Sequence, residues 1–531
     1  MKRIALLSLW IAATCFSVVA QKPDMDARKL QMALYAVTNL YVDPTDEGKL
    51  VEDAIVGMLE KLDPHSTYTD PEETKEMTEP LEGNFDGIGI QFNVLTDTVY
   101  VIQVIPGGPS EKVGLVAGDR IVQVNDTVIA GVKMKTTDIM KRLRGPKGSE
   151  VRVKVKRNGE SELLDFTIVR GKIPVHSIDA VYMADKSIGY IKLNRFAASS
   201  TEEFKEALKT LDKKGMKKLI LDLQGNGGGY LNVAIELADE FLARGKQIVY
   251  TQGSKQKRQD AISTAQGSFE DGELVILVDE SSASASEILS GAVQDWDRGV
   301  IVGRRTFGKG LVQRPLPLPD GSMIRLTVAR YYTPTGRCIQ KPYEKGKGED
   351  YAHDLIDRYN RGELMSADSI HFPDSMKYST LANGRTVYGG GGIMPDVFIP
   401  MDTTRYSDYH RDIVAKGLMN RVAMNYLDRN REELGKTYKK PQVYKEKFVV
   451  TDEIMNELKK MAEEAKITFK EEEYNRSLPL IQLQIKALIA RDLYDMTEYF
   501  YIINDVNDSY QEALRILNDE ERYHKIVGVK Q

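Results

Sequence analysis

Residues 274–293 read LVILVDESSASASEILSGAV, and this stretch decides the fold of the central part of the chain. The apolar run 274–278 is short and continuous, as expected of a strand that is buried on both faces of a sheet. Small residues follow it as a loop, and from Ser284 onward the apolar residues recur at helical spacing. Hydrolases present a nucleophile on this same succession of strand, tight turn, serine and helix.

The same serine also fits a structural role. Ser284 and Glu287 have the spacing of a capping box, in which the serine satisfies a backbone N–H at the start of a helix. On residues 274–293 alone, the cap is the simpler interpretation.

A lysine downstream favours the role of Ser284 as a nucleophile over its role as a helix cap. Residues 303–313 read GRRTFGKGLVQ, so Lys309 stands between two glycines, which suits neither a helix face nor a solvated charge run. A lysine desolvated in such a place loses its proton more readily and can act as a general base toward a serine hydroxyl. If the segment is extended, Gln313 shares a face with Lys309 and can hold its amine by a hydrogen bond.

Residues 303–309 also match the start of a phosphate-binding loop, G-x-x-x-x-G-K. However, Gly310 stands where a serine or threonine would hold Mg²⁺, and Pro315 and Pro317 prevent the helix that this loop requires. The sequence therefore argues against nucleotide binding.

A glycine-rich turn follows another buried strand upstream. Residues 219–229 read LILDLQGNGGG, and glycines allow backbone N–H groups to approach a ligand closely, as an oxyanion hole requires. A plain tight turn has the same composition, which alone does not decide between them.

Around these motifs the hydrophobic pattern divides the chain into segments. Residues 21–82 show helical periodicity. Residues 83–172 form short alternating strands, with one helix near 137–143 and a hairpin turn at Asn158-Gly159. Residues 173–402 alternate buried strands with amphipathic helices, which indicates an α/β core with a polar insertion at 341–385. Residues 403–531 are charged and helical.

Ser284, Lys309 and Gln313 together resemble the signature of the C-terminal processing peptidases, also called tail-specific proteases. The resemblance covers about residues 30–400, and the flanking motifs agree with it: LDPHS at 62–66, YTPTG at 332–336 and GGIMPD at 391–396. It implies an α/β multidomain protein, with a crotonase/ClpP-like catalytic core on a parallel-type sheet, an inserted β-rich PDZ domain at 83–172, and helical N- and C-terminal segments.

The resemblance also implies an oxyanion hole. Its first donor is the Ala285 N–H, directly after the nucleophile. Its second donor is placed on Gly228, although the family usually carries Arg and Pro where this chain has Gln224 and Gly227, so that glycines 227–229 all stay candidates.

The β-rich segment contains its own candidate binding loop. In Gly87-Ile88-Gly89-Ile90, glycines precede a strand, so backbone N–H groups can capture a terminal carboxylate while the peptide extends the sheet edge. The helix with Ile139, Met140 and Leu143 would form the other wall of the groove. A structural turn is the alternative for this loop.

The N-terminus reads as a cleaved signal peptide, residues 1–20. Lys2 and Arg3 precede the apolar run 4–14, and small residues precede Gln21. The run is too short to span a membrane, and Thr14 before Cys15 is a poor fit to a lipidation motif. We therefore expect export to the periplasm or another extracytoplasmic space. Cys338 is then the only cysteine, so an intramolecular disulfide is excluded.

Composition limits the partners. Lys and Arg number 73 against 78 Asp and Glu, a formal net charge of −5, which argues against nucleic acid as a partner. The six histidines are scattered and no His/Cys spacing resembles a zinc site, so no metal and no other cofactor is expected.

The sequence therefore predicts an exported serine endopeptidase whose substrates are proteins with accessible C-terminal tails. A catalytically silent scaffold that binds tails through the PDZ domain is the alternative. A homo-oligomer assembled through the helical termini, and a regulatory partner, are two options that the resemblance leaves open.

Overall fold

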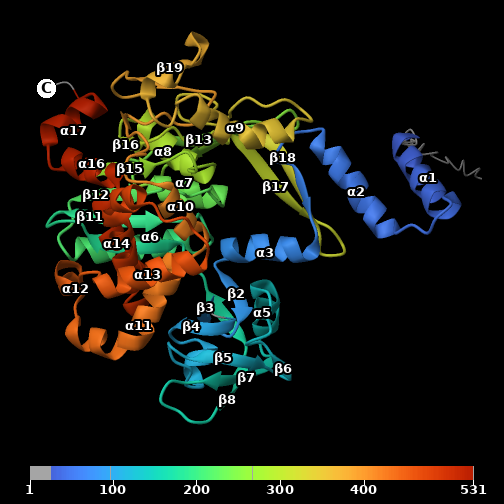
Figure 1. Ribbon diagram of the computed structural model, residues 1–531. Helices are drawn as coiled ribbons and strands as arrows, with labels where there is room; N and C mark the ends of the chain where they lie inside the picture. The colour runs from blue at the N-terminus through green and yellow to red at the C-terminus, as the bar shows by residue number, and fades with distance from the viewer. Residues whose placement is uncertain (1–24, 96, 266, 530–531) are drawn as a thin grey trace, which may run out of the picture.

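The computed structural model describes residues 25–95, 97–265 and 267–529. The predicted signal peptide, with Cys15, lies outside these residues. No described helix is long and apolar enough to cross a membrane. Figure 1 shows a central α/β body, a β-rich domain below it, a helical domain beside that, and an N-terminal helical arm that projects from the body.

The centre of the molecule is a six-stranded sheet in which every neighbouring pair is parallel except the first. The strand predicted from the apolar run 274–278 is present as β15. In sheet order the strands are β10 (Ile178–Met183), β11 (Ile188–Leu193), β12 (Lys218–Asp222), β15 (Glu273–Val278), β16 (Val300–Gly303) and β21 (Val397–Phe398).

Helices cover both faces of this sheet, which explains its continuous apolar strands. Three helices pack on one face: α6 (Ser200–Asp212), α7 (Leu231–Asp239) and α8 (Ala285–Asp295). Two helices from the far C-terminus pack on the other: α16 (Asp508–Leu517) and α17 (Glu520–Val527). Along β15, Leu274 and Ile276 join the first core, whereas Val275 and Leu277 join the second.

A second, antiparallel sheet stands beside the first and carries a long hairpin. It consists of β1 (Thr67–Thr69), β13 (Gln247–Gln252), β14 (Gln259–Ile262), β17 (Leu311–Pro317) and β18 (Met323–Tyr332). The predicted insertion at 341–385 contains α9 (Gly348–Asn360), the 3₁₀ turns η1 (Ala367–Ser369) and η2 (Asp374–Met376), and β19 (Lys377–Ser379), which pairs with β20 (Thr386–Tyr388).

The β-rich domain is attached through a two-stranded stalk, in which the entering strand β2 (Asn84–Gly87) pairs with the leaving strand β9 (Gly171–Pro174). Its sheet has β3 at one edge, and helix α5 lies near the residues predicted for it. The elements are β3 (Ile90–Leu95), β4 (Thr98–Val104), α4 (Pro109–Lys112), β5 (Arg120–Val124), β6 (Thr127–Val128), α5 (Thr136–Leu143), β7 (Glu150–Lys156) and β8 (Leu164–Val169).

The hairpin predicted at Asn158-Gly159 is present, with a connection longer than two residues. Seven residues, 157–163, connect the antiparallel pair β7 and β8. Asn158 and Gly159 are the central residues of a turn in which the Glu160 N–H donates to the carbonyl of Arg157 at 3.3 Å, and Gly159 has a positive φ of +88°. The Lys156 ammonium, which donates to the carbonyl of Glu160 at 2.6 Å, adds a side-chain contact to this turn.

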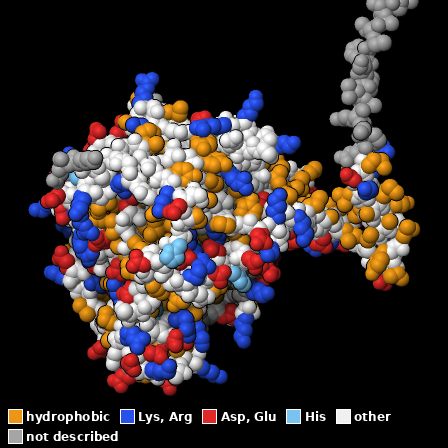
Figure 2. Space-filling view, turned by 90° about the horizontal axis from the view of Figure 1, so that it is seen from above, with side chains coloured by type: hydrophobic (Ala, Val, Ile, Leu, Met, Phe, Trp, Pro, Cys, Tyr) orange, Lys and Arg blue, Asp and Glu red, His pale blue; other side chains and the backbone are white. Residues whose placement is uncertain are grey.

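The N-terminal segment forms three helices, α1 (Met25–Leu40), α2 (Glu47–Glu60) and α3 (Pro71–Glu82). Helices α1 and α2 make the projecting arm, and α1 has no buried residue. Figure 2 shows apolar side chains gathered on this arm, among them Leu30, Met32, Tyr35 and Leu40.

The C-terminal segment, predicted as one helical extension, has two parts. Helices α10 to α14 enclose a core of their own, which we call the helical domain, whereas α16 and α17 cover the second face of the central sheet. The remaining helices are α10 (Asp408–Ala415), α11 (Leu418–Thr437), α12 (Pro441–Lys447), α13 (Asp452–Glu464), α14 (Glu471–Leu493), α15 (Met496–Ile503) and η3 (Asn504–Val506).

Candidate active site

Ser284 lies between the end of β15 and the start of α8, half-buried and with an unusual backbone. Its φ is +57° and its ψ is −111°, whereas a serine that only caps a helix takes an extended conformation. A positive φ is uncommon for a residue with a Cβ and is maintained only where the surroundings enforce it. The backbone at Ser284 thus resembles the strained turn on which hydrolases expose a nucleophile.

The carboxylate of Glu287, fully buried, ties the serine turn to the lysine loop. One of its oxygens, Oε2, accepts from the N–H groups of Ser284 and Lys309, both at 2.8 Å. The other, Oε1, accepts from the Gly308 N–H at 2.7 Å and from the Thr306 hydroxyl. From the sequence, the capping box predicted only the contact between Glu287 and Ser284. The contacts of Glu287 with Thr306, Gly308 and Lys309 were not predicted.

Tyr331, on β18, joins the same two backbones from the carbonyl side. Its buried hydroxyl lies 3.1 Å from the carbonyl oxygen of Ser284 and also within hydrogen-bond distance of that of Lys309. Ser284 and Lys309 are therefore neighbours, held by one carboxylate and one hydroxyl. Nothing in the sequence singled out Tyr331.

Lys309 is held as its spacing from Gln313 predicted. Its ammonium nitrogen donates to Gln313 Oε1 at 3.0 Å. Burial, with a smaller contribution from the positive charge of Arg325, lowers the pKa of Lys309 to about 8. About a tenth of this lysine is therefore neutral at pH 7, and the neutral form is the one that can act as a general base.

Two further groups fix Gln313, and the sequence did not assign them a role. Arg325, on β18, donates to Gln313 Oε1 at 2.6 Å, and the Gln313 amide donates to the carbonyl of His65. Burial lowers the pKa of His65 to about 4, so its ring is neutral and does not compete as a cation. The LDPHS motif thus supports the site through its backbone, and it was visible in the sequence only as a family landmark.

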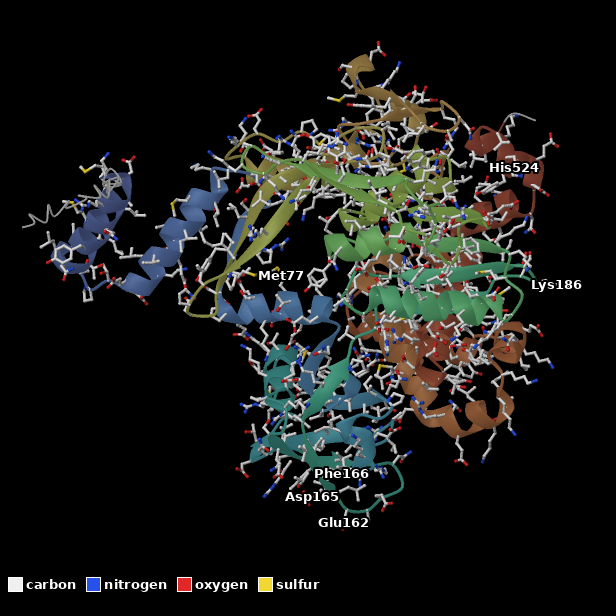
Figure 3. The ribbon with its side chains drawn as sticks, turned by 180° about the vertical axis from the view of Figure 1, so that it is seen from behind. Met77, Glu162, Asp165, Phe166, Lys186 and His524 are labelled. Carbon is white, nitrogen blue, oxygen red and sulfur yellow. The ribbon has the colours of Figure 1, made fainter. Side chains whose placement is uncertain are left out.

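Arg325 also contacts the helix that leads to the β-rich domain. Its Nη1 lies 3.0 Å from the sulfur of Met77 on α3, and Figure 3 shows Met77 between α3 and the β17–β18 hairpin.

The glycine-rich turn lies against the serine. A Cβ on Gly228 would come within 2.9 Å of Ser284 Cβ and 3.0 Å of the Ala285 nitrogen, and φ is +103°, so this close approach requires glycine. The Gly228 N–H, however, donates to Asn226 Oδ1 at 2.9 Å, so it must leave that acceptor to reach an oxyanion. The Ala285 N–H is the first of α8, where helix backbone donors have no partner within the helix.

Residues 303–309 do not have the structure of a phosphate-binding loop. The strand ends at Gly303 and is followed by a loop and a β-hairpin instead of a helix. The N–H groups of Gly308 and Lys309, which would face a phosphate, are occupied by the carboxylate of Glu287.

In the β-rich domain, Gly87, Ile88, Gly89 and Ile90 line a cavity of about 400 Å³ together with Met140 and Leu143 of α5. Strand β3 begins at Ile90, so Ile88 and Gly89 form the loop in front of it. The candidate binding loop thus lies on the same cavity as two of the three residues predicted for the second wall, whereas Ile139 is buried in the core of the domain.

Among the described residues, one cluster has metal-ligating types: Glu273, Glu520 and His524. The ammonium of Lys218 lies 2.9 Å from the Glu273 carboxylate and already neutralises it. Figure 3 shows His524 at the opposite side of the body from Met77, so this cluster is remote from the hairpin that carries Gln313.

Activity should rise with pH if Lys309 acts as the base. With a pKa of about 8, the neutral fraction grows about tenfold per pH unit below pH 8 and levels off above it. Replacing Arg325 by glutamine removes a like charge, so the pKa of Lys309 should rise and the midpoint of kcat/KM against pH should move upward. The matched control is Arg330→Gln, an exposed arginine on the same strand, which should leave the midpoint unchanged. A profile that is flat from pH 6 to 9 would contradict the assignment.

Comparison with known proteins agrees with this geometry. A model of peptidase family S41 matches residues 187–351, and a PDZ-domain model matches residues 87–168. The N-terminal domain of the activating protease CtpB matches residues 15–74, and a family of unknown function matches residues 409–495.

Individual proteins match along most of the chain. The carboxy-terminal-processing protease of Bartonella bacilliformis is 38% identical over 309 residues, which cover 57% of this chain and 70% of that protein. The carboxy-terminal processing protease CtpB of Bacillus subtilis is 35% identical over 356 residues, covering 65% and 72%. Among solved structures, a photosystem II D1 C-terminal processing protease is 32% identical, covers 58% of this chain and 83% of its own, and has a TM-score of 0.33.

Proposed function

The chain belongs to the carboxy-terminal processing proteases of peptidase family S41, and from that premise we propose that it is an exported endopeptidase with a Ser284/Lys309 dyad. It is a serine-type peptidase with a PDZ domain, and thus a hydrolase. In our proposal the PDZ domain binds the C-terminal tail of a protein substrate while Ser284 attacks a peptide bond upstream.

In this mechanism the neutral amine of Lys309 takes the proton of the Ser284 hydroxyl. Ser284 Oγ attacks the scissile carbonyl, and the Ala285 N–H, with a donor from Gly228, stabilises the oxyanion. The protonated lysine returns its proton to the leaving amine, and water hydrolyses the acyl-enzyme. Gln313 keeps the lysine amine in place. None of these steps requires a metal or an organic cofactor.

One observation supports the dyad above all others. Ser284 and Lys309 are 25 positions apart, yet their N–H groups donate to the same oxygen of Glu287. The backbone nitrogens of Ser284 and Lys309 each lie 2.8 Å from that oxygen, so the two side chains leave the backbone close to each other.

Three further features belong to the proposal. Export rests on the predicted signal peptide. The crotonase/ClpP-like kinship of the catalytic core rests on the parallel sheet and the helices on both its faces. Assembly through the helical termini is supported by the apolar side chains exposed on α1 and α2.

Tail recognition can be tested with three versions of one tagged protein that differ only at the C-terminus: free and apolar, amidated, or ending in Asp. Amidation removes the charge that the loop 87–90 would bind, and charge-assisted hydrogen bonds are roughly twice as strong as neutral ones. A terminal Asp would have to be desolvated in an apolar pocket. Mass spectrometry of the fragments at subsaturating substrate should show slower cleavage of both modified proteins, with KM raised more than kcat is lowered.

The Ser284→Ala variant is the control for this assay and should cut none of the three. Equal cleavage of all three by the wild type would remove the PDZ domain from substrate selection. Cleavage by Ser284→Ala would remove Ser284 from catalysis.

A further inference from the structure

The cavity at the binding loop of the PDZ domain is lined by a second domain as well. Besides the loop and α5, its walls include Arg491 and Asp492 at the end of α14 and Met496 at the start of α15. These residues come from the C-terminal helices, which are remote in sequence and which the predicted tail groove did not include.

The C-terminal residues meet the face of the PDZ sheet that is turned away from α5. On β3, Ile90 and Phe92 pack against the core of the PDZ domain, whereas the alternate residue Asn93 donates to the sulfur of Met424 on α11 at 3.2 Å. On β4, Ile102 joins Met424 in a separate buried cluster. The cavity has both Phe92 and Asn93 in its walls, so it extends around the edge of β3 from one face to the other.

A polar anchor holds this arrangement. The carboxylate of Asp428 on α11 accepts from the Tyr100 hydroxyl at 2.6 Å and from Arg120 at 2.5 Å, both on the PDZ sheet. Tyr100 is buried and the other two side chains are partly buried. Burial together with Asp428 raises the pKa of Tyr100, so this hydroxyl stays protonated and donating. In Figure 1, α11 lies beside the PDZ strands β4 and β5.

β3 is the edge strand on this side of the sheet. Within the described part of the chain its one neighbour is β4, so its other edge is open to an added strand. A tail that extends the sheet there places alternate side chains on opposite faces. The terminal residue and its alternates would face α5, and the penultimate residue and its alternates would face the helical domain.

We propose that the PDZ domain and the C-terminal helices together form the tail site. In this site Met496, at the corner between α14 and α15, contacts the side chains of the tail that point away from α5 and so selects among them. This rests on the proposed tail recognition and extends it. The preferred substrates then end in consecutive apolar residues, because both faces of the bound strand meet apolar walls.

The chemistry of the second wall supports an apolar occupant. Met496 is 38% exposed and Ile102 is buried, and a methionine adapts to side chains of differing shape. Two arginines line the cavity, and both are paired: the Arg491 guanidinium is bound to the carboxylate of Asp492 through Nε at 2.7 Å and Nη2 at 3.2 Å, and Arg144 is bound to Glu79 at 2.8 Å. These pairs carry no net charge and offer little to an acidic tail residue.

The test measures binding of fluorescent tail peptides, by anisotropy, to the full chain carrying Ser284→Ala. The peptides have a free apolar end and differ only in the penultimate residue: Leu, Lys or Asp. We expect the Leu peptide to bind about tenfold more tightly than the Asp peptide. Met496→Glu should move the preference toward Lys, and Met496→Lys should move it toward Asp, each by about tenfold. Reciprocal changes of preference cannot arise from a loss of folding.

Met376→Glu is the matched control, because Met376 is 37% exposed and directly precedes β19, which Figure 1 shows at the opposite end of the molecule from the PDZ domain. The penultimate preference should be the same as in the parent protein. If Met496→Glu and Met496→Lys also keep that preference while binding still depends on a free carboxylate, the two-domain site is wrong and tail recognition stands. If no peptide binds, or amidated peptides bind equally well, tail recognition fails and this inference fails with it.

Discussion

Replacing Lys309 by arginine should abolish peptidase activity, by about 10³-fold or more, with the fold retained. Arginine keeps the positive charge and nearly the length of the side chain, but it does not release its proton at any working pH. A lysine that served only as a structural cation would tolerate this change. Lys309→Ala should be equally inactive, because it also lacks a base. The measurement is kcat/KM on a tail-bearing substrate, beside the melting temperature of each variant.

The control is Lys341→Arg, a lysine close to the same site. Its ammonium is bound to Asp354 at 2.8 Å and lies over the rings of Phe307 and Tyr351. Arginine can make both kinds of contact, so this variant should keep most of the activity. Substantial turnover by Lys309→Arg would show that Lys309 is not the base and would redirect the search to a neutral imidazole.

The sequence predicted the parts of the site that are local. The apolar run of β15, the serine turn and the start of α8 follow from hydrophobic periodicity within 20 residues, and the Lys309–Gln313 contact follows from the alternation of an extended chain. Each of these depends on neighbours in sequence, where spacing and backbone geometry are sufficient.

The parts that were missed depend on long-range packing. Tyr331 and Arg325 reach the site because β18 folds back on β17, and His65 reaches it because β1 pairs with β18. Their residue types have no local pattern that would mark them. The LDPHS motif was the single available signal, and it indicated relatedness without indicating a contact.

The charged helical pattern after residue 402 concealed two different roles for the same reason. Amphipathic spacing shows that a helix has an apolar face, but it does not show which core that face joins. Helices α10 to α14 turn theirs toward one another, whereas α16 and α17 cover the second face of the catalytic sheet. The buried strands of that sheet required such a cover, and it could have been sought among the late helices on that ground.

Replacing Glu287 by glutamine should be almost as damaging as replacing it by alanine, although glutamine has nearly the same shape. The two carboxylate oxygens accept four hydrogen bonds, two each. An amide has one accepting oxygen, and its NH₂ group would face two donors. Whichever way it turns, two buried donors lose their acceptor, at ~1–3 kcal/mol each. Replacement by alanine leaves all four donors without this acceptor, but it also removes the cost of burying a charge, which raises the pKa of Glu287 to about 7, so we expect a net loss of similar size.

We therefore expect both Glu287 variants to lower the melting temperature by roughly 10 °C and the activity by at least ~100-fold, because the serine turn and the lysine loop lose the group that joins them. Glu280→Gln is the matched control, since Glu280 lies in the same loop, is mostly buried and has one ion-pair partner, Arg304. It should cost less than either change at Glu287 and keep most of the activity, because glutamine keeps an oxygen that can accept from Arg304. If Glu287→Gln melts and cuts like the wild type, Glu287 acts merely as a helix cap, and the positions of Ser284 and Lys309 must then be fixed by Tyr331 and the surrounding packing alone.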